Sequence, residues 1–92
     1  MTPHAAETLA LSALGWLAGH DELWPVFLGA TGADAASLRA QAQDPEFLAA
    51  VLDFILMDDA WVAECAVALD QNPDTIAHAR AALPGGAQVH WT

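Results

Sequence analysis

The sequence has no lysine and no tyrosine, and its only arginines, Arg39 and Arg80, stand against 12 aspartates and glutamates. The formal net charge at pH 7 is therefore −10. Nucleic-acid binding relies on lysine and arginine to neutralise phosphates, and attraction to an anionic membrane surface relies on the same side chains. We therefore expect no nucleic acid and no membrane among the partners. A basic protein or a cation is compatible with this charge.

Cysteine is nearly absent as well. Cys65 is the only one, which excludes an internal disulfide and any zinc site built from several cysteines. It follows Trp61 by one helical turn on an apolar stripe, and no neighbouring base or positive charge would activate it. We expect a buried, inert thiol.

Long apolar runs are missing too. The longest extends from Leu9 to Gly19 with Ser12 inside it, about half the length of a transmembrane helix. No lysine or arginine precedes it, whereas a secretory signal begins with positive charge. We interpret the run as a buried core helix and expect a cytoplasmic protein.

The residues that are present favour helices. Alanine dominates, β-branched residues are few, and no segment alternates with a period of two. With 92 residues and 55% hydrophobic content, the chain can build one modest core. The prediction is an all-α single domain of five to six short helices over residues 1–83, followed by a C-terminal tail over residues 84–92.

Helix starts are marked by polar caps, several of them followed by proline. The strongest signal is Asp44-Pro45-Glu46, and the helix that follows, Phe47–Met57, is predicted to centre the core. The first helix, from Pro3 to about Ala18, is apolar nearly all round and is also expected to be central. The predicted caps are Thr2, Asp21, Asp34, Asp44, Asp58 or Asp59, and Asn72.

Motifs that would identify chemistry are lacking. No two histidines have the spacing of a metal site on a helix, and Asp58-Asp59 does not fit a calcium loop. We predict no catalytic, cofactor-binding or metal-binding residue. An enzyme acting through His20, Asp58 and Asp59 is the least favoured reading.

The order of several segments is distinctive. Phe27–Gly32 is followed by Leu38-Arg39, then by Asp44–Leu48 and by Val51–Asp59. This order resembles a bacterial, mostly alphaproteobacterial family catalogued as the domain of unknown function numbered three-five-seven-two. The resemblance covers about residues 8–83. It implies a small helical domain without an assigned activity, and it supplies no catalytic residue.

Aromatic side chains suggest a role in binding. Four tryptophans are more than a core of this size hides easily, and aromatic residues are enriched at the centres of interfaces. The leading hypothesis is a non-enzymatic module for protein–protein interaction or self-association. The alternative is a helical protein that binds a ligand or acyl group in an aromatic-lined pocket. The candidate interface or pocket residues are Trp16, Trp24, Phe27, Trp61 and Trp91, the last expected to dock onto this domain or a second copy.

Overall fold

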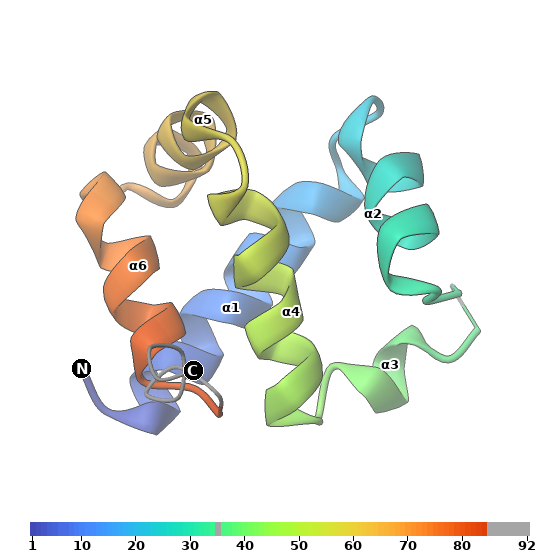
Figure 1. Cartoon of the computed structure of the whole chain (residues 1–92), viewed down its shortest axis with the longest axis horizontal. Coiled ribbons are helices and arrows are strands. Elements are labelled where there is room, and N and C mark those ends of the chain that lie inside the picture. The colour runs from blue at the N-terminus through green and yellow to red at the C-terminus, as the bar shows by residue number, and fades with distance from the viewer. Residues whose placement is uncertain (35, 85–92) are drawn as a thin grey trace, which may run out of the picture.

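The computed structural model describes residues 1–34 and 36–84, and these residues form six α-helices and no strand (Figure 1). The predicted all-α class is confirmed. The predicted tail over residues 84–92, with Trp91, lies outside the described residues apart from Pro84. The helices are α1 (Pro3–Ala18), α2 (Leu23–Thr31), α3 (Leu38–Gln41), α4 (Pro45–Leu56), α5 (Asp59–Leu69) and α6 (Pro73–Ala81).

Four helices begin at side chains that the sequence predicts as caps: Thr2, Asp44, Asp58 and Asn72. Each side-chain oxygen accepts the backbone N–H of a residue two or three positions later, at 2.8–3.1 Å. These bonds satisfy N–H groups that have no partner within the first helical turn. The starts of α1, α4, α5 and α6 therefore coincide with caps that the local sequence reveals.

The prediction that Asp21 caps the second helix is wrong. The Nδ1 atom of His20 accepts the backbone N–H of Leu23 at 3.2 Å, and Glu22 at the cap position makes no side-chain bond. His20 precedes Leu23 by three residues, the spacing at which a capping side chain reaches an N–H. An imidazole nitrogen with a free lone pair can accept this bond as a carboxylate does.

The region around α3 also departs from expectation. Asp34 Oδ1 accepts the N–H of Ser37 at 2.9 Å, but α3 begins only at Leu38, so Asp34 closes a turn before the helix and does not cap it. The preceding helix ends at Gly32, whose φ of 72° favours glycine.

Helix α4 lies in the middle of the core, as predicted. It packs against α1, α5 and α6 (Figure 1). Its side chains Val51, Leu52 and Ile55 are fully buried. Its apolar residues recur every three or four positions and so share one face. The amphipathic pattern identified the centre of the fold correctly.

Helix α1 is central but not surrounded. It packs on α2, α4, α5 and α6 through a face containing Ala6, Ala10, Ala13 and Leu17, all fully buried. Small side chains allow neighbouring helices to approach closely. The expectation that this helix is central is confirmed, but its opposite face is exposed, with Leu11 at 45%.

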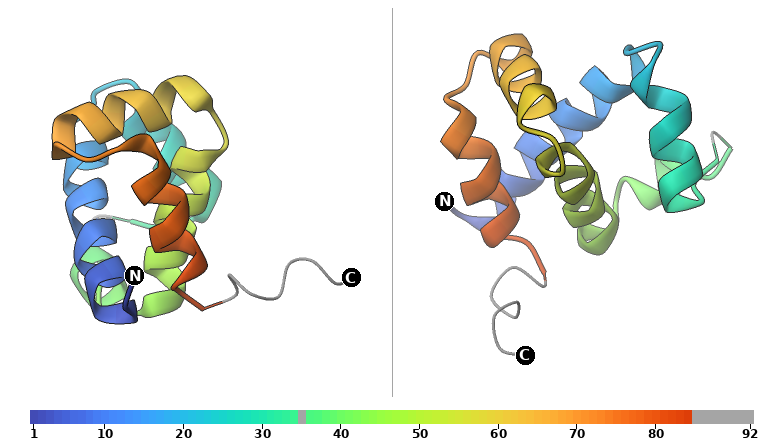
Figure 2. Two further views of the ribbon diagram at one scale, coloured as in Figure 1. Left: turned by 90° about the vertical axis from the view of Figure 1, so that its left-hand side faces the viewer. Right: turned by 45° about the horizontal axis from the view of Figure 1, so that its top comes forward.

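Helix α5 lies across one end of the group formed by α1, α4 and α6 (Figure 2). Only one side of α5 can then contact the core, and its buried residues are Cys65 and Ala66. Within the described residues, every helix falls short of the length and apolar character that a membrane-spanning segment requires.

Candidate functional site

Three of the predicted aromatic residues, Trp24, Phe27 and Trp61, belong to one series of ring contacts. Trp24 stacks on Phe27 with centroids 5.6 Å apart, and Phe54 stacks on Trp61 at 5.0 Å. Phe27 and Phe54 meet edge to face at 5.4 Å, and Phe47 adds a further edge contact to Phe27 at 6.0 Å. The series joins α2, α4 and α5, so these rings contribute to the packing of the core.

Trp16 lies apart from that series. Its ring meets the imidazole of His20 edge to face, with centroids 5.3 Å apart, one helical turn along the chain. Trp16 is half-buried and packs at the margin of the core. The four candidate residues that the structure describes therefore do not line a single pocket. They are Trp16, Trp24, Phe27 and Trp61.

Trp16 instead borders an open groove between α1 and α5, with a volume of about 450 Å³. The α5 side of the groove contributes Ala63, Glu64, Val67 and Ala68, all exposed. Val67 is 82% exposed, the largest exposure among the described large apolar side chains. We call the groove together with exposed Ala60, one turn earlier on α5, the α1–α5 surface.

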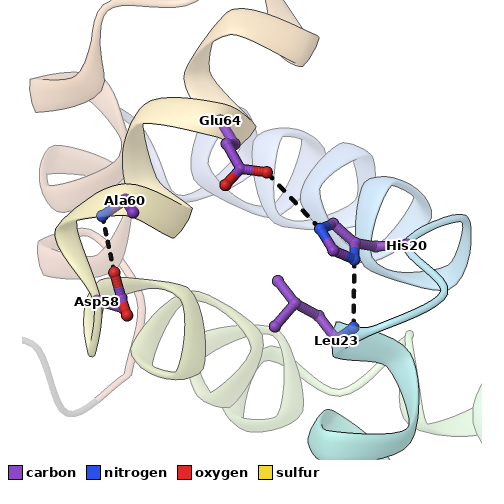
Figure 3. Close-up of polar contacts among 5 residues, drawn as sticks. All are labelled: His20, Leu23, Asp58, Ala60 and Glu64. Atoms are coloured by element: carbon purple, nitrogen blue, oxygen red, sulfur yellow. Dashed lines mark hydrogen bonds and ion pairs between the residues drawn. The ribbon is translucent and has the colours of Figure 1, made fainter.

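A polar link closes one edge of the α1–α5 surface (Figure 3). The Nε2 atom of His20 lies 3.7 Å from Glu64 Oε1, while its Nδ1 accepts the N–H of Leu23. With Nδ1 accepting, the neutral ring carries its proton on Nε2, which faces the carboxylate. Through these two contacts His20, which follows the end of α1, links it to Leu23 at the start of α2 and to Glu64 on α5.

Asp58 and Asp59, which the least favoured hypothesis assigns to an enzyme site together with His20, do not pair with that histidine. Asp58 Oδ1 accepts the N–H of Ala60 at 2.8 Å, and Asp59 occupies the first turn of α5. His20 pairs with Glu64 and with neither aspartate. Across the described residues no cluster of three or more histidine, cysteine, aspartate or glutamate side chains could hold a metal ion.

Cys65 is fully buried, as predicted. Burial raises the pKa of its thiol from 9.0 to about 11, because the apolar core disfavours the thiolate. A nucleophilic cysteine requires the opposite shift. The geometry gives Cys65 a packing role.

A second hollow of about 310 Å³ lies beside the first half of α1. Leu9, Leu69 and Thr75 are among its lining residues, so it touches both α5 and α6. Its lining mixes apolar groups with hydroxyls and an amide. It contains none of the predicted aromatic residues.

Sequence reasoning missed the α1–α5 surface and the His20–Glu64 pair. The apolar stripe on which the sequence places Trp61 and Cys65 also includes Val62, Ala66 and Leu69, and this side of α5 faces the core. The signal for the other side was present, because Val67 falls outside that stripe and yet is apolar. The His20–Glu64 pair joins residues far apart in sequence, for which no local pattern exists.

Fold and surface together define a small, acidic, all-α domain with an exposed apolar groove. The family model described as "Protein of unknown function (DUF3572)" matches residues 3–86, and the chain therefore belongs to this family. The predicted resemblance is confirmed, and it extends further at both ends than residues 8–83. No curated protein and no solved structure matches the chain significantly.

Proposed function

We propose that this protein is a non-enzymatic binding module that contacts another protein through the α1–α5 surface. The observation that carries the proposal is the apolar outer side of α5, where Ala63, Val67 and Ala68 lie exposed beside Trp16. Contiguous exposed apolar surface bordered by polar groups is typical of protein-binding sites. Tryptophan is among the residues most enriched at the centres of such sites.

The identity of Val67 supports this proposal. A solvent-exposed helix position gains stability from alanine, glutamate or lysine, whereas valine loses side-chain freedom there. Val67 is 82% exposed and so gains little from burial in the isolated chain. An apolar side chain at this position is useful where a second molecule covers it.

The alternative function, binding of a ligand or acyl group among the aromatic residues, has weaker support. Trp24, Phe27 and Trp61 belong to one packed ring series with Phe54, so each of these rings already has an aromatic neighbour. A drug-sized ligand usually buries most of its surface in its pocket.

The expected cytoplasmic location is in keeping with a single, unpaired cysteine.

Site-specific photo-cross-linking in the source cell tests the proposed function. A photoreactive side chain at position 67 should give a discrete protein adduct, identified by mass spectrometry. The matched control is position 26 on α2, where Val26 is also exposed, at 51%. Absence of an adduct at position 67, or the same adducts at both positions, would contradict the proposal.

A further inference from the structure

We infer that the partner presents an amphipathic helix whose apolar stripe is flanked by lysine or arginine, and that this helix lies along α5 in the groove. The inference rests on the proposed function and specifies the partner of the same surface. Its basis is the combination of an apolar floor with a rim that carries acidic side chains and no arginine.

The rim is acidic at several points. Glu64 lies in the groove itself, and its side chain is 57% exposed, so its carboxylate can accept a charged hydrogen bond from outside. Asp59 and Asp70 lie at the two ends of α5, both exposed. Exposed Asp21 and Glu22 directly follow His20, whose Nε2 atom lies 3.7 Å from Glu64 Oε1.

Neither arginine compensates these charges. The guanidinium of Arg80 donates to Asp53 at 2.6 Å and to the carbonyl oxygen of Pro84 at 2.9 Å, on the α4–α6 side of the molecule. Arg39 belongs to α3, at the far end of the molecule from α5 (Figure 1). A partner that supplies its own cations therefore complements this surface.

The shape of the floor favours a helix. Ala60, Ala63, Val67 and Ala68 follow one another at helical spacing along the exposed side of α5. This stripe is roughly 12 Å long at 1.5 Å per residue, about two turns of a partner helix. Small side chains permit close helix–helix approach, and Trp16 provides a wall against which an apolar side chain can pack.

A second copy of this chain fits less well. In a symmetric dimer the same surface meets itself, so each copy would bring Glu64 and its acidic rim toward those of the other. Each copy has a net charge of −10 and no lysine to offset this repulsion. Charge complementarity therefore selects a basic partner over self-association.

Selection from a display library of helical peptides against the full chain tests the inference. The recovered peptides should carry lysine or arginine beside an apolar stripe, and their affinity should fall as salt concentration rises. V67E should weaken their binding about tenfold or more, whereas V26E should leave it unchanged. Because position 67 is exposed and glutamate is a good helix former, V67E should retain the fold.

The sign of the V67E effect separates groove binding from non-specific attraction. V67E adds negative charge, so a basic peptide held only by net charge would bind it as well or better, and that result would overturn the inference. E64Q should weaken binding and reduce its salt dependence, because it removes a charge without removing apolar contact.

Two further outcomes distinguish this inference from the proposed function. Peptides without basic enrichment that still lose affinity for V67E would overturn the inference and leave the proposed function standing. A dimer in sedimentation equilibrium that V67E dissociates would overturn the inference and show that the surface binds a second copy of this chain. Recovery of no peptide, together with no adduct at position 67, would overturn both.

Discussion

Alkaline pH should destabilise this protein through one side chain. The sequence contains neither lysine nor tyrosine, and arginine keeps its charge to much higher pH. Cys65 is therefore the only side chain expected to change charge between about pH 9 and pH 11. Burial raises the pKa of its thiol from 9.0 to about 11, so the folded chain holds this proton more tightly than the unfolded chain does.

The sign and size of the effect follow from this difference. Between the two pKa values the unfolded chain has lost the proton and the folded chain has kept it, so the free energy of unfolding falls as pH rises. A shift of two pKa units corresponds to roughly 3 kcal/mol in full, of which about half is lost by pH 10. For a domain of this size, that full loss lowers the melting temperature by roughly 10–20 °C.

Urea unfolding followed by circular dichroism at pH 8, 9, 10 and 11 measures this loss. The control is C65A, which removes the titrating thiol and should show little change in the free energy of unfolding over the same range. A wild-type protein whose stability stays flat from pH 9 to pH 11 would refute the reasoning. An equal decline in C65A would assign the effect to another group.

Three other predictions concern the core, a cap and the charge. F27A removes the ring that contacts Trp24, Phe47 and Phe54. It should lower the free energy of unfolding by about 3–5 kcal/mol in urea titrations. The control V26A, on the same helix, should change this free energy by less than about 0.5 kcal/mol. D58A should cost about 1 kcal/mol by loss of the cap bond to Ala60, and millimolar calcium or magnesium should shift the melting temperature of neither D58A nor wild type. Gel shifts with random duplex and single-stranded DNA or RNA at physiological salt should detect no binding tighter than about micromolar, because the net charge is −10.

The helix starts that were predicted correctly share a local cause. At Asp44, Asp58 and Asn72 the side chain reaches an N–H two residues later, and proline or an acid follows at once. Capping needs only these few residues, so a short stretch of sequence contains the information. The amphipathic stripe of α4 is local in the same sense, because its period reveals the buried face without knowledge of the neighbours.

The failed prediction at α2 shows where local information ends. Asp21 and His20 are adjacent, and either can accept a backbone N–H near the start of that helix. The structure selects His20, whose ring also packs on Trp16 and faces Glu64 of α5. Tertiary contacts with a distant helix stabilise one cap over the other, and residue type cannot reveal those contacts.

Helix α5 is a second case in which local sequence does not decide the outcome, here which side of the helix is buried. Its sequence is apolar nearly all round, and such a helix is either buried on every side or covered by something else. Its position across one end of α1, α4 and α6 lets only the side with Cys65 and Ala66 reach the core. The other side, with Ala63, Val67 and Ala68, is left in contact with solvent, although most of its residues are apolar. Composition alone could not choose between the two cases, because the choice depends on how many helices pack around α5. Once the fold shows how many helices pack around α5, the exposed apolar side of α5 becomes the strongest reason to look for a partner.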